Sequence, residues 1–250
     1  MMEEHITSRQ NRLFQHLRKL QSSRAYRQET GEFCADGTKL LEEAIRWYPG
    51  LHTVIACEGL SLPDLPDRVR LVRVPESLMQ AVSTMKAPQG AIFLCGMPEE
   101  QPLTVEPGSL ILDGIQDPGN LGTILRTADA LNVPVLLTDG CADPYNEKTV
   151  RASMGAVFRT QPRQAKAEEI LSYCAAHQIP VAATALSSRS EDIRTAKLSA
   201  CAVVIGSEGQ GIRELFLERS DKLLIIPMQE RCESLNAAVA ATIVMWEMRR

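Results

Sequence analysis

The sequence predicts an α/β protein whose carboxyl-terminal part holds a mostly parallel sheet and is preceded by a smaller α/β domain. From residue 109 onward, short apolar runs alternate with helical patterns, which is typical of a parallel sheet covered by helices. At residues 98–108 the composition changes, because three prolines and a final glycine resist both helix and central strand. A chain of 250 residues, 44% of them apolar, can bury two cores of modest size. We therefore predict domains at residues 1–97 and 109–250, joined by a linker at residues 98–108.

The amino-terminal domain shows both helical and strand periodicity. Leu13, Phe14, Leu17 and Leu20 recur at helical spacing, and short apolar runs bounded by turn residues predict buried strands. The predicted helices span residues 8–22 and 38–47, and the predicted strands span residues 52–57, 70–74 and 91–95.

The carboxyl-terminal domain alternates strand and helix along the chain. The predicted strands are residues 109–113, 134–138, 181–184, 201–206 and 222–226, and the predicted helices are residues 121–131, 147–158, 167–177 and 212–218.

The last segment, residues 234–250, predicts a helix that is apolar on almost every face and that Ser234 could cap. Such a helix must be buried, either in its own domain or against a second copy of itself. Small residues on several of its faces favour the second copy, so we expect a homodimer formed through this helix.

Composition excludes several classes of protein. A net charge of −4 argues against holding nucleic acid by bulk positive charge. The seven cysteines form no C-x-x-C pair and have no nearby histidines, so neither a metal site nor disulfides are expected. We expect the cysteines to be small buried side chains of a protein in a reducing compartment. The amino terminus is unlike a signal peptide and no apolar run is long enough to cross a bilayer, so we expect a cytoplasmic protein without a membrane role.

A local basic strip stands out against this acidic background. Residues 9–27 hold six cationic side chains and no acid, interleaved with aromatic rings that could stack on bases. A charge run is by default a solvated helix face, but here it also predicts contact with RNA. The predicted contacts are Arg9, Arg12, Arg18, Lys19, Arg24 and Arg27, with Arg151 as a further phosphate contact near the active site.

Three polar, turn-rich segments follow predicted strands, where ligands of parallel α/β sheets bind. They read LDGIQDPGNLGTILRTA at residues 112–128, AVVIGSEGQGI at residues 202–212 and LIIPMQERCESLN at residues 224–236. Taken singly, Asn120 and Ser234 could be plain helix caps, Arg126 a solvated side chain, and the glycine-rich turn an ordinary connection. Asn236 is harder to dismiss, because an amide in an apolar helix needs partners.

Together and in this order, the three segments resemble the motifs of the SpoU-type, or TrmH-type, RNA 2′-O-ribose methyltransferases of the SPOUT superfamily. The stretches DPYN at residues 143–146 and VRASMGA at residues 150–156 are similar to the region between the first two motifs of that family. The segments LRKL at residues 17–20 and FCADGTKLLEEA at residues 33–44 resemble its RNA-binding domain, which has the fold of ribosomal protein L30e. The resemblance covers nearly the whole chain.

The resemblance implies a catalytic domain tied in a trefoil knot, S-adenosyl-L-methionine as cofactor, no metal, and transfer of its methyl group to a ribose 2′-hydroxyl. The implied cofactor contacts are Gly206, Ile226 and Leu235, and the implied catalytic or RNA-side residues are Asn120, Arg126, Glu208, Ser234 and Asn236. A guanidinium with a pKa above about 12 is normally not a base, so Arg126 could instead hold a phosphate and stabilise the developing alkoxide. Ser207 and Ala238 depart from the usual family residues.

Ribosomal RNA is the expected target, because the separate amino-terminal domain resembles that of the ribosomal enzymes. Transfer RNA is an alternative, and so is an RNA-binding or ribosome-assembly protein of the same fold without transfer activity. A nucleotide-dependent enzyme that uses residues 206–211, such as a dehydrogenase, is a further reading, but it lacks the G-x-G-x-x-G fingerprint.

Overall fold

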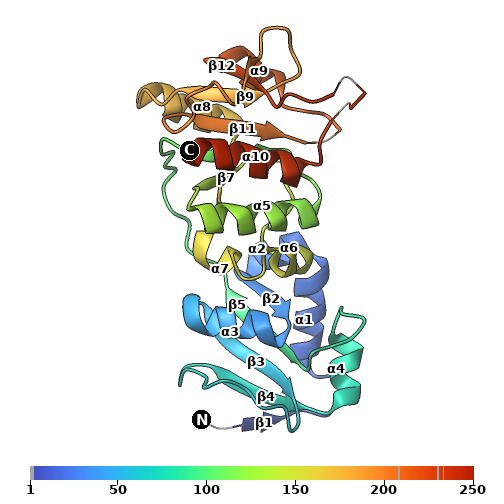
Figure 1. Ribbon diagram of the computed structural model, residues 1–250. Coiled ribbons are helices and arrows are strands. Elements are labelled where there is room, and N and C mark those ends of the chain that lie inside the picture. The colour runs from blue at the N-terminus through green and yellow to red at the C-terminus, as the bar shows by residue number, and fades with distance from the viewer. Residues whose placement is uncertain (1–2, 208, 230, 233) are drawn as a thin grey trace. The chain divides into compact units, whose positions relative to one another are not determined.

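The computed structural model describes residues 3–250 except 208, 230 and 233, and its chain packs into two compact units. The first unit comprises residues 1–99 and 145–159, and the second comprises residues 100–144 and 160–250 (Figure 1). By packing, residues 145–159 therefore belong with the amino-terminal unit, although they lie within the range that the sequence analysis assigns to the second domain.

The first unit is built on a mixed sheet of five strands in the order β1-β4-β3-β5-β2. Strands β1, β4 and β3 are parallel, and β5 runs antiparallel to both β3 and β2. Its elements are β1 (Glu3–His5), α1 (Arg12–Ser22), α2 (Arg24–Thr30), β2 (Glu32–Asp36), α3 (Thr38–Trp47), β3 (Leu51–Cys57), β4 (Arg70–Val74), α4 (Glu76–Val82), β5 (Ala91–Gly96), α6 (Glu147–Ser153) and α7 (Val157–Thr160).

Apolar side chains cover both faces of this sheet, because successive residues of a strand point to opposite sides. Along β5, Phe93 faces a cluster with α3, whereas Leu94 faces a cluster with α1 and α4. Val150 and Phe158 of the returning segment belong to the α3 cluster, so α6 and α7 complete the cover of that face.

The second unit holds a sheet of seven strands in the order β10-β12-β9-β11-β6-β7-β8, and every pairing in it is parallel. This confirms the predicted parallel sheet; that the chain threads a trefoil knot stays a prediction. The elements are β6 (Leu110–Asp113), α5 (Pro118–Leu131), β7 (Val135–Leu137), β8 (Arg163–Gln164), α8 (Ala167–Ala176), β9 (Val181–Thr184), β10 (Glu191–Asp192), β11 (Ala202–Gly206), α9 (Glu214–Arg219), β12 (Lys222–Ile225) and α10 (Ala237–Arg249).

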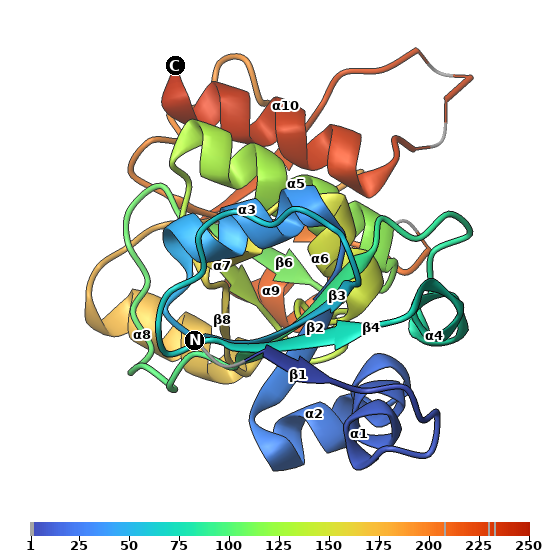
Figure 2. The ribbon, with the colours of Figure 1, turned by 90° about the horizontal axis from the view of Figure 1, so that it is seen from below.

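Helices cover the second sheet on two sides. Val203 of β11 packs with α5 and α10, and its neighbour Val204 packs with α8 and α9. Helices α5 and α10 lie side by side in both views (Figures 1 and 2).

The last helix is only partly buried within one chain, so its own domain covers only part of the helix that the sequence predicts to be buried. One face, with Ala241, Val244 and Met245, is buried, whereas Val239 and Trp246 are 50% and 64% exposed. No helix in the described part of the chain is long and apolar enough to cross a membrane.

The cysteines are mostly buried, as predicted. Five of the seven are buried, Cys57 is half-buried and Cys232 is exposed. Burial raises the pKa of the Cys174 thiol to about 11, so this thiol stays protonated at neutral pH. The described residues contain no group of three or more histidine, cysteine or acidic side chains that could hold a metal ion.

Candidate active site

The three polar segments leave the second sheet along the line of its strands' carboxyl ends, which we call the strand-end edge. Because all its strands are parallel, their carboxyl ends lie along the same side. Asp113, at the end of β6, pairs in register with Gly206, at the end of β11, and β12 ends two strands further along. The sequence pattern thus placed the segments after the correct strands, and the topology makes them neighbours.

The first segment enters α5 through Asp117, which is the helix cap. Its Oδ1 accepts a hydrogen bond from the backbone N–H of Asn120 at 2.8 Å, and Pro118 occupies the first helical position. Asn120 therefore lies in the first turn of α5, and its amide is not used as the cap.

The third segment enters α10 through Asn236, not through Ser234 as predicted. The Asn236 Oδ1 accepts hydrogen bonds from the backbone N–H groups of Ala238 and Val239 at 3.0 and 3.3 Å. Ser234 is exposed and lies two residues before the cap. A side chain can cap a helix only from the residue just outside the first turn, and Asn236 holds that place.

Asn236 also joins the starts of α5 and α10. Its Nδ2 donates a hydrogen bond to Asn120 Oδ1 at 3.0 Å, across 116 positions of sequence. Asn120 is half-buried and Asn236 is exposed, so both amides are within reach of a ligand. Two of the predicted catalytic residues are therefore in direct contact.

Arg126 is not part of this junction within one chain. On a regular helix, six residues separate it from Asn120 by about 9 Å along the axis and about 120° around it. Its side chain is exposed on α5, and with the described residues it forms no hydrogen bond or ion pair. Glu208, the other predicted charged residue, lies outside the described residues.

The turn after β11 is closed tightly on itself. The backbones of Ser207 and Gly211 exchange two hydrogen bonds of 3.1 and 3.0 Å. A Cβ on Gly206 would come within 2.2 Å of the Gly211 carbonyl, so no larger residue fits there without moving the turn. The turn itself therefore requires glycine at position 206.

The residues at this edge fit S-adenosylmethionine. Ile226, which directly follows β12, and Leu235, which precedes α10, are half-buried apolar residues. Gly206 offers only backbone groups. A ligand with an adenine ring needs apolar contact together with a few backbone hydrogen bonds. These residues would hold the cofactor, which when bound supplies a methyl group activated by a sulfonium charge.

Sequence reasoning missed the segment at residues 185–190. It follows β9, which lies between β11 and β12, so it leaves the sheet between Gly206 and Ile226. The Ala185 backbone N–H donates to Leu224 O at 2.9 Å, which fixes the start of this segment beside β12. Polar residues following a predicted strand were the available signal.

The predicted RNA contacts of the first unit divide into two sets. Arg27 is buried and donates to the backbone carbonyl of Leu20, so it does not reach the surface. Arg151 is half-buried, and its charge acts on Asp36 and Glu147 within the unit. The remaining predicted contacts are exposed: Arg9, Arg12, Arg18, Lys19 and Arg24.

The buried acids beside Arg151 are not ordinary surface carboxylates. Desolvation by burial raises the pKa of both Asp36 and Glu147. The charge of Asp36 raises the pKa of Glu147 further, and the charge of Arg151 partly offsets the shift of both groups. They lie in the first unit, on β2 and α6.

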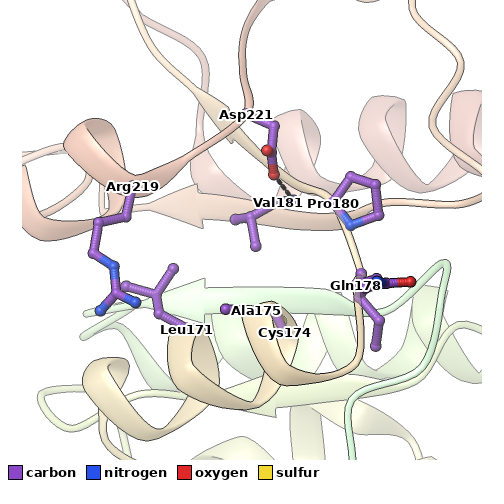
Figure 3. Close-up of a pocket in the computed structure, with 9 residues that line it drawn as sticks. Leu171, Cys174, Ala175, Gln178, Pro180, Val181, Arg219 and Asp221 are labelled. Carbon is purple, nitrogen blue, oxygen red and sulfur yellow. Dashed lines mark hydrogen bonds between the residues drawn. The ribbon is translucent and has the colours of Figure 1, made fainter.

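A surface pocket of about 290 Å³ lies at the other edge of the second sheet (Figure 3). It is lined by α8 and by the starts of β9 and β12, where Asp221 Oδ2 accepts from the backbone N–H of Val181 at 2.8 Å. It therefore lies away from the carboxyl ends of the strands and from the predicted cofactor residues.

The fold and the strand-end edge define a ligand-binding parallel α/β domain joined to a smaller α/β unit. Residues 108–246 match the sequence model of the SpoU rRNA methylase family, and residues 11–92 match the MRM3-like substrate binding domain. The chain belongs to the SpoU rRNA methylase family.

Relatives of known name agree with this assignment. The chain is 33% identical, over 98% of both chains, to the 23S rRNA (guanosine(2553)-2′-O)-methyltransferase RlmP of Bacillus subtilis. It is 30% identical to the mitochondrial rRNA methyltransferase 3 of Xenopus tropicalis, over 91% of this chain and 72% of the relative. The AdoMet-bound rRNA methyltransferase from Sinorhizobium meliloti superposes with a TM-score of 0.87 at 29% identity, over 99% of this chain and 98% of the other.

The predicted class of enzyme, an S-adenosylmethionine-dependent RNA methyltransferase with a separate substrate-binding domain, is therefore confirmed. The dehydrogenase reading is wrong.

Proposed function

We propose that this chain transfers a methyl group from S-adenosylmethionine to a ribose 2′-hydroxyl of ribosomal RNA. The observation that carries the proposal is the Asn120–Asn236 hydrogen bond at the edge where Gly206 and Ile226 also emerge. This edge offers amide groups for a ribose beside a half-buried apolar surface for the cofactor. The names of the Bacillus and Xenopus relatives support a ribosomal target.

The residues that the family resemblance implies have separate roles in the proposed reaction. Asn120 and Asn236, which bond to each other at the starts of α5 and α10, orient the ribose, and Ser234 adds an exposed hydroxyl nearby. Because a guanidinium is normally not a base, Arg126 binds the neighbouring phosphate and stabilises the developing alkoxide, while another group takes the proton of the hydroxyl. Glu208 holds a group of the site in place, as the family resemblance implies.

RNA is held mainly by the first unit. The cations of α1 and its flanks are exposed, and Lys19 Nζ lies 5.1 Å from the centroid of the Tyr26 ring. Phosphates bind such a basic face, and a tyrosine beside it can stack on a base. We assign residues 1–97 as the RNA-binding domain, 98–108 as the linker and 109–250 as the transferase domain.

The working form is a homodimer in the cytoplasm. Val239 and Trp246 are exposed on α10 and lie seven residues apart, which places them two turns apart on one helix face. A second copy of α10 is the partner that would cover these two side chains.

The test is transfer of labelled methyl from S-adenosylmethionine to unmodified RNA, followed by nucleoside analysis. We expect the wild type to give a 2′-O-methylnucleoside in ribosomal RNA, and Arg126→Ala to lose at least a hundredfold in rate while it still binds the cofactor. Arg219→Ala, which changes an exposed arginine at the opposite edge of the sheet, is the matched control. Label in transfer RNA alone would reject the ribosomal target.

The second candidate is an RNA-binding protein that has lost transfer. Ala238, which departs from the family pattern, is the residue that favours it, because it removes a hydroxyl from the start of α10. Binding of RNA without any label transfer by the wild type would support this candidate and overturn the enzyme.

A further inference from the structure

The most heavily bonded group at the strand-end edge is the carboxylate of Asp113, to which the sequence analysis gave no role. Its side chain is 1% exposed. Oδ1 accepts hydrogen bonds from Thr138 Oγ1 at 2.9 Å and from Arg213 Nε at 2.7 Å, and Oδ2 accepts one from the Arg213 backbone N–H at 2.8 Å. A buried carboxylate with this set of donors is fully compensated and fixed in place.

These bonds tie together the ends of three adjacent strands. Arg213 closes the turn that follows β11, Asp113 ends β6, and Thr138 follows β7, so Asp113 lies on the middle strand of the three. The second half of the Arg213 guanidinium reaches the exposed Asp139, where Nη1 lies 3.1 Å from Oδ1. Arg213 therefore spans from the β11 turn to the β7 end.

Arg213 also fixes the far end of the turn that begins at Gly206. The near end is held by the Ser207–Gly211 backbone bonds and by the close packing of Gly206 against Gly211. Only Ile212 separates that closed part from Arg213. Contacts therefore hold the turn at both ends. At the second end the contact is the hydrogen-bonded Asp113–Arg213 pair, whose residues are 100 positions apart in the sequence.

We propose that Arg213, held by Asp113, is a positioning residue that sets the β11 turn for cofactor binding and couples it to the segment that carries Asn120. The coupling follows because Asp113 is the last residue of β6, and the segment that leads into α5 starts at the next residue. In this proposal Arg213 contacts neither the methyl donor, S-adenosylmethionine, nor the RNA that accepts the methyl group. The proposal rests on the proposed methyl transfer.

The test compares Arg213→Ala and Arg213→Lys with the wild type in the full-length protein. Binding of S-adenosylmethionine is measured by calorimetry, and kcat and the KM for RNA are measured by label transfer. We expect Arg213→Ala to raise the cofactor Kd about tenfold or more and to lower kcat, with the KM for RNA within twofold. Arg213→Lys keeps the positive charge but lacks the planar guanidinium group, so its cofactor Kd and kcat should lie between those of the wild type and of Arg213→Ala.

Two controls separate positioning from general loss of structure. Arg219→Ala alters the other arginine of the same short segment, at the far end of α9, and should leave every constant within twofold. Asp139→Asn removes only the exposed contact of Arg213 and should have a small effect. A purely structural role would reduce the fraction of active protein, and so the apparent kcat, without changing the cofactor Kd.

The outcomes decide between the possibilities. A folded Arg213→Ala protein whose cofactor Kd and kcat stay within twofold of the wild type overturns the inference while leaving the proposed function intact. If Arg213→Ala does not fold, Arg213→Lys decides by the same criterion. If the wild type transfers no methyl group, the proposed function is wrong. The cofactor Kd of the Arg213 variants still tests the Asp113–Arg213 pair in that case, so the two failures remain distinguishable.

Discussion

At the scale of single residues, Gly206 shows how one missing side chain shapes the site. The turn after β11 passes so close to Gly206 that a Cβ would meet the Gly211 backbone carbon and oxygen at 2.2 Å. Backbone atoms cannot move aside as the end of a flexible side chain can. The strand end and the turn are thus one rigid piece as long as this position is glycine.

Gly206→Ala should therefore open the turn. We expect a loss of about 1–3 kcal/mol in the free energy of unfolding, as for overpacked sites, and at least a tenfold weaker cofactor Kd. Gly209→Ala is the matched control, because nothing lies within 4 Å of its added Cβ, and it should change stability by less than about 0.5 kcal/mol. Denaturant unfolding and calorimetry measure both, and equal effects of the two substitutions would contradict the expectation.

Glu147 illustrates a residue whose charge costs stability. It is 8% exposed, and desolvation, together with the nearby Asp36, raises its pKa above the ordinary 4.5. With a raised pKa the folded state binds more protons than the unfolded state, so this group makes stability fall as the pH rises from 4.5 through the folded pKa.

Glu147→Gln removes this ionisation, so its stabilising effect should grow with pH. We expect the difference in thermal midpoint between the variant and the wild type to be larger at pH 8 than at pH 4. The exposed Glu168, in the first turn of α8, provides the control substitution Glu168→Gln, whose difference should not grow in this way. A Glu147→Gln difference that shrinks as the pH rises would show that Arg151 and Arg27 dominate this carboxylate.

At the scale of elements, the strands and helices with clear periodicity were predicted well. The helix at residues 38–47 and the strands at residues 70–74 and 181–184 agree with the structure at both ends. Each has a regular apolar pattern and clear breaks on either side, and such local signals determine an element without knowledge of its neighbours.

Elements fixed by tertiary contacts were not predicted. Residues 147–158 were expected as one helix, but Met154 and Gly155 adopt positive φ values of 51° and 87° and divide it into α6 and α7. A Cβ on Gly155 would approach the Glu43 side chain to 2.9 Å, so the break allows the segment to pack closely against α3. The edge strand β1 and the short helix α2 likewise lack an apolar repeat of their own.

The candidate site was predicted in its parts but not in its connections. The sequence indicated Asn120, Gly206 and Asn236, yet the Asn120–Asn236 bond joins positions 116 apart and depends on how α10 packs on α5. The same holds for the Asp113–Arg213 pair. Arg27 carries the same charge as its exposed neighbours, and only packing shows that it is buried.

The start of α10 combines a structural and a functional role in one side chain. Asn236 caps the helix with its oxygen and binds Asn120 with its nitrogen. Asn236→Ala should lose both and cost about 1 kcal/mol in the free energy of unfolding. Asn236→Ser keeps a capping oxygen but lacks the amide donor, so we expect it to recover most of the stability and little of the methyl transfer.

Thermal unfolding and label transfer measured on the two variants separate the roles. Asn120→Ala leaves the cap of α10 in place and should resemble Asn236→Ser in both measurements. If Asn236→Ser restores transfer to the wild-type rate, the amide donor has no part in the reaction.

At the scale of the whole molecule, the exposed side of α10 is the feature that a single chain leaves unexplained. Trp246 is 64% exposed and Val239 is 50% exposed, on a helix whose other side is packed into the core. Large apolar side chains gathered on one face of a helix are typical of an interface between proteins. The half-buried Ile243 lies between them along the helix.

We expect the protein to sediment as a dimer and Trp246→Asp to convert it to a monomer, because a buried charge without a partner disfavours the interface. Trp47, 52% exposed at the end of α3 in the first unit, provides the matched substitution Trp47→Asp, which should leave the dimer intact. Within the described part of one chain Arg126 forms no hydrogen bond to the asparagine pair. We expect the second copy to complete the site, so loss of the dimer should also lower methyl transfer at least tenfold. A monomeric Trp246→Asp protein with wild-type transfer would show that one chain holds a complete site, and a monomeric wild type would remove α10 as an interface.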